Sequence, residues 1–153
     1  MKIGLISDTH RYRDENCQIP DWIKQAFVGV DLIVHAGDIE HENFITNLEK
    51  IAPVYAVKGN CDSYYSKNPI ALNINIGCGY LTVAHKPKDA RNALEIHSRV
   101  LVYGHTHIAT LYEEGDLIVI NPGSAYEPRS AMPPSVALLD IENDNISAKI
   151  IYK

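Results

Sequence analysis

The chain contains 153 residues with a formal net charge of −5 at pH 7, and 46% of its residues are hydrophobic and 22% charged. These values are typical of a soluble globular protein, and the length predicts a single domain over residues 1–153. The negative charge argues against bulk binding of nucleic acid, and no apolar run approaches the roughly 20 residues of a membrane-spanning helix, so we expect neither partner.

Apolar runs alternate with amphipathic segments in the first third of the chain. Residues 2–7, 31–36 and 53–57 are short apolar runs, which predicts three strands. Residues 20–28 and 40–51 carry apolar side chains at helical spacing, which predicts two amphipathic helices. We therefore expect an α/β protein.

The remainder of the chain is predicted to be mainly β-structure. Alternating patterns and glycine-containing turns predict hairpins over residues 70–84 and 109–120 and an antiparallel pair over residues 136–152. Between them, residues 88–96 are predicted to form a helix with His97 on its apolar face. Polar or proline-rich composition predicts loops at residues 11–18 and 126–134.

Several predicted strands end in side chains that can bind a metal ion. The strand at residues 100–103 leads into Gly104, His105 and His107. If this segment is extended, the two imidazoles lie on the same side of the backbone. Two solvated histidines in a loop would give the same pattern, so this motif alone does not decide between the two interpretations.

Polar side chains recur at the ends of five predicted strands, and this repetition favours a metal site. Sites in open α/β sheets lie beyond the carboxyl ends of the strands, so we expect these side chains to meet. Seven donors exceed the four of a tetrahedral zinc site and suit two divalent cations bridged by Asp38. The seven candidate ligands are Asp8, His10, Asp38, Asn60, His85, His105 and His107.

The donor set indicates both the metal ions and the substrate. Imidazole, carboxylate and amide donors suit manganese, nickel, iron or zinc, and we expect manganese. Two such ions against the carboxylates of Asp8 and Asp38 leave a positive centre, which attracts a small phosphoester. Hydroxide activated by the two ions would attack that ester in line, with Asp38, Asn60 and His85 as the catalytic residues.

Further polar residues near the strand ends have open roles. Cys61 could contact the substrate or be an inert thiol. Asp62 could contact the substrate, cap a turn or orient a metal ligand. Lys86 could bind phosphate or be a solvated lysine. His35 lies inside an apolar run and is expected to be structural, and Glu40 is expected on a solvated helix end. The candidate substrate contacts are Cys61, Asp62, Lys86 and Ser124.

These motifs together resemble one known protein family. The segments Asp8-x-His10, Gly37-Asp38, Gly59-Asn60, His85 and Gly104-His-x-His107 resemble the motifs of the calcineurin-like metallophosphoesterases. The small size and the variants Gly59-Asn-Cys-Asp62 and Asn121-Pro-Gly-Ser124 resemble its compact bacterial and archaeal phosphodiesterase branch, the YfcE-like proteins.

The resemblance implies both a fold and a set of metal ligands. The fold would be the α/β metallo-dependent phosphatase fold, with two mixed β-sheets packed as a sandwich and flanked by helices. Two metal positions would share Asp38 as a bridge. The first would be held by Asp8, His10, Asp38 and His107, and the second by Asp38, Asn60, His85 and His105.

Two positions depart from the wider family pattern. Cys61 stands where larger members have a histidine that is thought to protonate the leaving group, as is usual in the compact branch. This departure favours esters with good leaving groups. The fourth motif reads His85-Lys86-Pro87 in place of His-Gly-His, which alters the loop beside the second metal position.

The sequence therefore predicts a metal-dependent phosphodiesterase acting on a small substrate. A phosphomonoesterase would use the same metals, and a non-catalytic scaffold resembling the retromer subunit of this fold is a third alternative. The cysteines Cys17, Cys61 and Cys78 form no paired spacing, which indicates reduced thiols. The early Asp8 argues against a signal peptide, so we expect a cytoplasmic protein. The last strands could pair between subunits of a homo-oligomer.

Overall fold

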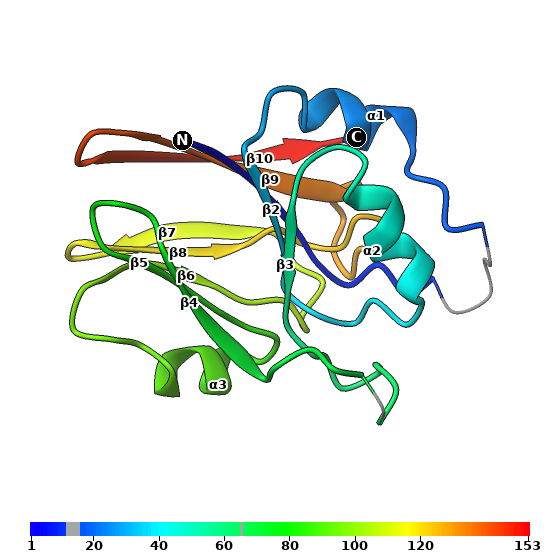
Figure 1. The fold of residues 1–153 in the computed structure, drawn as a ribbon, viewed down its shortest axis with the longest axis horizontal. Helices are drawn as coiled ribbons and strands as arrows, with labels where there is room; N and C mark the ends of the chain where they lie inside the picture. The colour runs from blue at the N-terminus through cyan, green and yellow to red at the C-terminus, as the bar shows by residue number, and fades with distance from the viewer. Residues whose placement is uncertain (12–15, 65) are drawn as a thin grey trace.

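The computed structural model describes residues 1–11, 16–64 and 66–153 as two β-sheets with three short helices (Figure 1). The first sheet has the strand order β10-β9-β1-β2-β3. Strands β9 and β10 are antiparallel, whereas β1, β2 and β3 are mutually parallel. Its strands are β1 (Lys2–Ile6), β2 (Leu32–His35), β3 (Val54–Ala56), β9 (Ser135–Glu142) and β10 (Asn145–Tyr152).

The second sheet has the order β4-β5-β6-β8-β7. Its central strands β5, β6 and β8 are parallel, and an antiparallel strand flanks them on each edge. Its strands are β4 (Ala71–Asn75), β5 (Tyr80–Ala84), β6 (Ser98–Val102), β7 (Thr110–Glu114) and β8 (Leu117–Asn121). Both sheets are therefore mixed, as the resemblance implied.

The main core lies between the two sheets because alternate apolar side chains of facing strands point toward each other. Ile3 and Leu5 of β1 share one buried cluster with Leu81 and Val83 of β5 and with Val100 of β6. Opposite faces of the same strands bury residues against the helices. The two sheets therefore form a sandwich with a common apolar interior.

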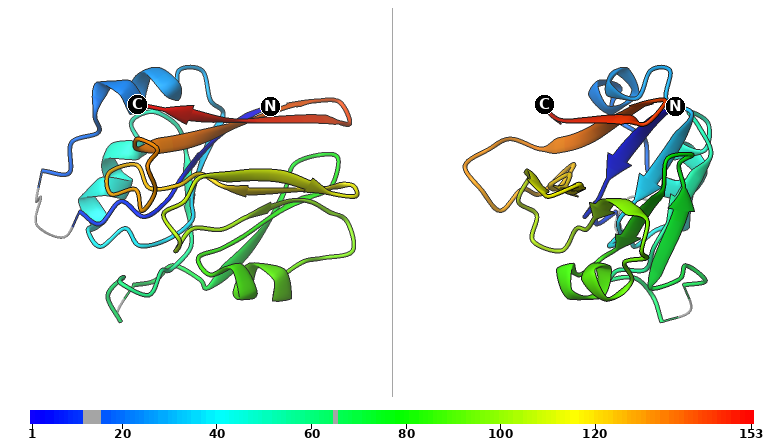
Figure 2. Two further views of the ribbon diagram at one scale, coloured as in Figure 1. Left: turned by 180° about the vertical axis from the view of Figure 1, so that it is seen from behind. Right: turned by 90° about the vertical axis from the view of Figure 1, so that its left-hand side faces the viewer.

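Helices cover both outer faces of this sandwich, on opposite sides of the molecule (Figure 2). Helices α1 (Asp21–Ala26) and α2 (Glu42–Leu48) pack with Phe27 against the first sheet. Helix α3 (Pro87–Asn92) packs Ala90 against the second sheet. The predicted fold, two mixed sheets flanked by helices, is confirmed.

Helix α3 is shorter than the sequence pattern predicted, and His97 was misplaced. The helix begins at Pro87, which suits a first helical position, and it ends at Asn92. His97 lies beyond the helix end with an exposed side chain, so the prediction that it belongs to the apolar face is wrong. Residues 12–15 of the predicted loop 11–18 lie outside the described residues.

The edge strands and the helix lengths are relevant to two kinds of partner, a second subunit and a lipid bilayer. Strand β10 forms one edge of the first sheet, and its pairing between subunits stays a prediction. The helices within the described ranges are too short or too polar to cross a lipid bilayer.

Candidate metal centre

The loops that follow the parallel strands meet where the two sheets adjoin. The loop after β1 pairs with the loop after β2, since the N–H groups of Asp8 and His10 donate to the carbonyls of Gly37 and Asp38 at 3.0 and 3.1 Å. The loop after β6 joins from the second sheet, where the backbone N–H of His105 donates to the carboxylate of Asp8 at 3.1 Å. Carboxyl ends of strands from both sheets thus converge, as expected.

Most of the predicted ligands adopt a left-handed backbone conformation. Non-glycine residues rarely take positive φ, and such residues cluster at functional sites. The side chains therefore converge through sharp turns, and the prediction that His105 and His107 align in an extended segment is wrong. The residues are Asp8 (φ 52°), His10 (φ 46°), Asp38 (φ 56°), His105 (φ 67°) and His107 (φ 59°).

Glycines permit the close approach of these loops. A Cβ atom on Gly104 would lie 1.9 Å from Oγ of Ser7 and 2.7 Å from Oδ2 of Asp8. A Cβ atom on Gly59 would lie 2.0 Å from Oδ1 of Asp38. Any side chain at either position would displace a predicted metal ligand.

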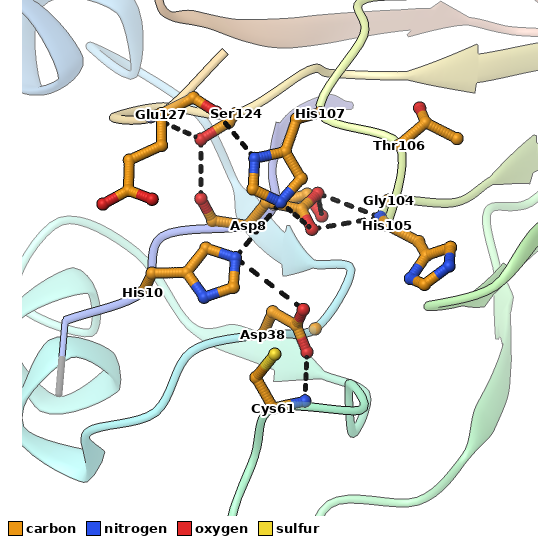
Figure 3. A network of polar contacts seen from close by, with 12 residues as sticks. Asp8, His10, Asp38, Cys61, Gly104, His105, Thr106, His107, Ser124 and Glu127 are labelled. Atoms are coloured by element: carbon orange, nitrogen blue, oxygen red, sulfur yellow. Dashed lines mark hydrogen bonds and ion pairs between the residues drawn. The ribbon is translucent and has the colours of Figure 1, made fainter. Parts of the chain in front are cut away.

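Four ligand atoms form a first cluster, which Figure 3 shows from close by. The Nε2 atoms of His10 and His107 lie 3.2 Å apart. Oδ1 of Asp8 lies 3.4 Å from Nε2 of His107, and Oδ2 of Asp38 lies 3.7 Å from Nε2 of His10. These are the four residues implied for the first metal position.

The hydrogen bonds at Nδ1 of His10 and His107 indicate what kind of ligand this cluster can bind. Nδ1 of His10 faces the carboxylate of Glu40, and Nδ1 of His107 faces the backbone carbonyl of Glu127 at 2.6 Å. Both partners are acceptors, so each neutral ring carries its hydrogen on Nδ1 and turns an Nε2 lone pair inward. The two lone pairs and the carboxylate of Asp8 then lie within 4.8 Å of one another, with Asp38 next to His10, and this donor set suits a divalent cation.

A second cluster shares Asp38. Nε2 of His85 lies 3.2 Å from Oδ2 of Asp38 and 3.1 Å from Oδ1 of Asn60. Its Nδ1 atom donates to the carbonyl of Ala36 at 2.9 Å, so the Nε2 lone pair again faces oxygen acceptors. Asp38 contacts both clusters, which fits a bridging carboxylate.

His105 lies beside these clusters. The ring of His105 packs edge-on against His85 with 5.1 Å between the centroids. The backbone N–H of His105 donates to both carboxylate oxygens of Asp8 at 3.1 Å. Among the described residues, the groups of ligand atoms within 4.8 Å of one another do not include its ring. Its position in Figure 3, to one side of Asp8 and Asp38, leaves its role as a ligand a prediction.

Burial and hydrogen bonds shift the pKa values of the acids in opposite directions. Burial raises the pKa of Asp8 despite the hydrogen bond from Ser7. Burial would also raise the pKa of Asp38, but the adjacent ring of His85 and the hydrogen bond from the backbone N–H of Cys61 hold it well below its usual range. Asp38 is thus an anion, as a bridging ligand must be.

Comparisons with known proteins identify the family of this chain. The calcineurin-like phosphoesterase superfamily domain matches residues 1–144. The chain belongs to this superfamily. A probable metallophosphoesterase of Methanothermobacter thermautotrophicus is 37% identical over 160 residues, which cover 99% of this chain and 92% of that relative.

One further relative of the calcineurin-like phosphoesterase and one solved structure of similar fold are informative. The phosphodiesterase YfcE of Escherichia coli is 32% identical over 103 residues, covering 61% of this chain and 55% of YfcE. Its structure superposes on 92% of this chain and 88% of YfcE with a TM-score of 0.72 and 25% identity. Vps29 of Entamoeba histolytica, solved with Zn²⁺, has a TM-score of 0.77 over 99% of this chain and 98% of that chain. At 20% identity, that likeness concerns the fold alone.

Asp62 organises the loops of this phosphoesterase from beneath the site. Its buried carboxylate accepts the backbone N–H groups of Asp38 at 3.1 Å and of Ile39, Glu40 and Gly59 at 2.7 Å. Both oxygens are thereby used. This arrangement favours the role of orienting neighbouring ligands over contact with a substrate.

Ser124 has a similar position on the other side of the site. Its hydroxyl donates to the backbone carbonyl of Asp8 at 2.7 Å and accepts the N–H groups of Tyr126 and Glu127. The same loop thus fixes the backbone of Asp8 and, through the carbonyl of Glu127, the ring of His107. Ser124 is fully buried, which favours positioning over substrate contact.

Cys61 and Lys86 are the exposed members of the predicted set. Sγ of Cys61 lies 3.2 Å from Nδ2 of Asn60, and burial with the charge of Asp38 raises the pKa of the thiol to about 11. Lys86 lines a cavity together with His85 and Asn60. Both side chains are accessible to a substrate.

Glu40 is the functional residue that the sequence interpretation missed. It was expected to be solvated, but its carboxylate binds the ring of His10. Spacing contained a signal, because Glu40 follows Asp38 by two positions as His10 follows Asp8. The amphipathic pattern of the next helix assigned Glu40 to a solvated face instead.

Proposed function

We propose that this calcineurin-like phosphoesterase is a metal-dependent phosphodiesterase that hydrolyses a small phosphodiester. The observation that carries the proposal is the convergence of two imidazole lone pairs, from His10 and His107, on the carboxylates of Asp8 and Asp38. YfcE, named a phosphodiesterase, supports the preference for a diester.

The chain's own residues assign the parts of this reaction. Divalent ions held here would supply Lewis-acid chemistry, polarising a phosphoryl oxygen and activating water. Asp38 bridges the two clusters, and Asn60 contributes a neutral amide oxygen that leaves the centre positive. His85, held by the carbonyl of Ala36, keeps its Nε2 atom directed at Asp38.

Manganese is the proposed ion, with nickel, iron and zinc as competitors, since the donors are imidazole, carboxylate and amide. We also propose that residues 1–153 form one domain, because both sheets share one core cluster. We also propose a cytoplasmic location, which the sparse cysteines at positions 17, 61 and 78, without paired spacing, support.

The test is hydrolysis of bis(p-nitrophenyl) phosphate by chelator-treated protein after addition of manganese, nickel, iron or zinc. We expect manganese-dependent turnover that Asp38→Asn lowers by about 100-fold or more, a loss on the scale of removing a metal ligand. Asp140→Asn, at an exposed position of β9, is the matched control and should retain the wild-type rate. Equal rates in Asp38→Asn and wild type would refute the proposal.

A parallel assay with p-nitrophenyl phosphate distinguishes a phosphodiesterase from the alternative function, a phosphomonoesterase. Faster turnover of this monoester than of the diester would assign the site to dianionic substrates. Absence of turnover on both esters with every metal, together with no bound ion, would favour a binding role for the fold.

A further inference from the structure

A second feature of the site is a cavity of about 430 Å³ beside the Asn60 and His85 cluster. Lys58 and Lys86 line it from the two sheets, the first two residues after the end of β3 and the second two residues after the end of β5. The same cavity is lined by Asn60 and His85 of the predicted second metal position.

Lys58 is held in place at the cavity wall. Its Nζ atom donates to the backbone carbonyl of Tyr64 at 3.3 Å and lies 5.5 Å from the centroid of the Tyr64 ring. The backbone N–H of Lys58 donates to the carbonyl of Pro69 at 2.8 Å, which holds the backbone at the end of β3 in place. Both contacts of the ammonium are thus with neutral groups of Tyr64.

Two carboxylates, those of Asp62 and Asp89, line the cavity together with the lysines. In the part of the chain that the structure describes, no ion pair joins Lys58 or Lys86 to a carboxylate. Asp62 also lines the cavity, but its oxygens are occupied by four backbone N–H groups. Asp89 is the second acidic residue of the lining, which thus carries two positive and two negative charges, but among these described residues the ammonium groups form no ion pair with either carboxylate and stay available to an anionic ligand.

We propose that this cavity binds a second phosphate group of the substrate, so that the substrate class is a phosphodiester carrying an additional phosphate. The inference rests on the proposed phosphodiesterase activity. A phosphate monoester carries a charge of about −1.5 to −2 at pH 7, which matches two ammonium groups better than a carboxylate does. Lysine is a common point-charge partner of phosphate.

Two chromogenic diesters that differ by one phosphate test this inference directly. They are thymidine 5′-(p-nitrophenyl phosphate) and the same compound with a 3′-phosphate. With the manganese-loaded protein, we expect a KM about tenfold lower for the 3′-phosphorylated compound, the size of one added charge-assisted contact. The ratio of the two KM values should fall to near one in the double variant Lys58→Gln, Lys86→Gln.

Lys88→Gln is the matched control, because Lys88 is exposed on α3 beside Lys86 but does not line the cavity. It should keep the wild-type ratio. A wild-type ratio of one, or a ratio unchanged in the double variant, would overturn the inference while hydrolysis of the parent diester still supported the proposed function.

Equilibrium binding gives a readout that does not depend on turnover. Isothermal titration calorimetry should show tighter binding of thymidine 3′,5′-bisphosphate than of thymidine 5′-phosphate, and the double variant should lose this preference. If neither chromogenic compound is hydrolysed, the proposed function fails and the calorimetric preference alone decides the inference. Equal affinity for the two nucleotides would overturn it, and thermal unfolding establishes that the variants are folded.

Discussion

The carboxylate of Glu40 accepts a hydrogen bond from Nδ1 of His10, 30 residues away in the chain. The bond fixes the tautomer of His10 and directs its Nε2 lone pair toward His107 and Asp38. A carboxylate that orients a histidine in this way raises the basicity of the ring as a metal ligand. Glu40 therefore supports the first metal position without needing to touch the ion.

Replacement of Glu40 should weaken metal binding. We expect Glu40→Ala to lower the affinity for manganese by about 10- to 100-fold, since the His10 ring loses its orienting partner. Glu40→Gln should have a smaller effect because the amide oxygen still accepts a hydrogen bond. Calorimetric titration of chelator-treated protein measures the affinity, and Glu42→Ala, at an exposed acid of α2, is the control. An unchanged affinity in Glu40→Ala would contradict this role.

Gly104→Ala should damage the metal centre through a steric effect. The new Cβ atom would lie 1.9 Å from Oγ of Ser7 and 2.7 Å from Oδ2 of Asp8, so the loop after β6 must move away from the loop after β1. We expect a loss of diesterase activity of about 100-fold, comparable to a misplaced catalytic group. Turnover of bis(p-nitrophenyl) phosphate measures this loss.

The control for Gly104→Ala is Gly29→Ala. Gly29 has a positive φ of 72° but no atom within 4 Å of an added Cβ. This variant should lose about 1 kcal/mol of folding free energy from the strained backbone and keep its activity. Comparable activity in the two variants would show that the loop adapts to the added methyl group.

His35 should make folding sensitive to acid. The ring is fully buried at the end of β2, where Nδ1 accepts the N–H of Gly37 at 3.2 Å and Nε2 lies 3.1 Å from Oγ1 of Thr9. Burial lowers the pKa of His35 from 6.5 to about 4. In that interval the unfolded chain binds a proton at His35 and the folded chain does not.

The free energy of unfolding should therefore fall as the pH decreases from 6.5 to about 4, and this contribution should level off below the folded pKa. One proton corresponds to a slope of at most about 1.4 kcal/mol per pH unit. Urea unfolding of chelator-treated wild type and His35→Gln across this interval measures the difference. Parallel curves for the two proteins would contradict the prediction.

Strong local patterns made most of the fold predictable. The alternating and apolar segments located the strands within a few residues, since most strands bury one face, although β7 is largely exposed. The predicted helix extended beyond the end of α3 because Leu94 also contacts the core, yet it does so from the turn after the helix. Periodicity could not separate a helical face from a packed turn.

The sequence predicted which residues the candidate site brings together, but it did not predict their geometry. The positions of Asp8, Asp38 and His85 just after predicted strands identified them, because functional sites of α/β proteins lie at the carboxyl ends of parallel strands. The turns that aim these side chains depend on left-handed backbone angles, which sequence spacing does not reveal. The supporting residues Glu40 and Asp62 were assigned elsewhere or left open, because their partners are backbone or ring atoms of distant loops.

Cys61 should make the rate depend strongly on the leaving group. A thiol whose pKa is raised to about 11 stays protonated at neutral pH and gives up its proton poorly, so departure of the alcohol receives little help. We expect kcat for a series of substituted phenyl diesters to fall steeply as the pKa of the leaving phenol rises. Cys61→His should flatten this dependence, because an imidazole at the exposed position beside Asn60 can protonate a poor leaving group. Cys78→His, away from the centre, is the control, and an equally steep dependence in wild type and Cys61→His would show that position 61 takes no part in protonation.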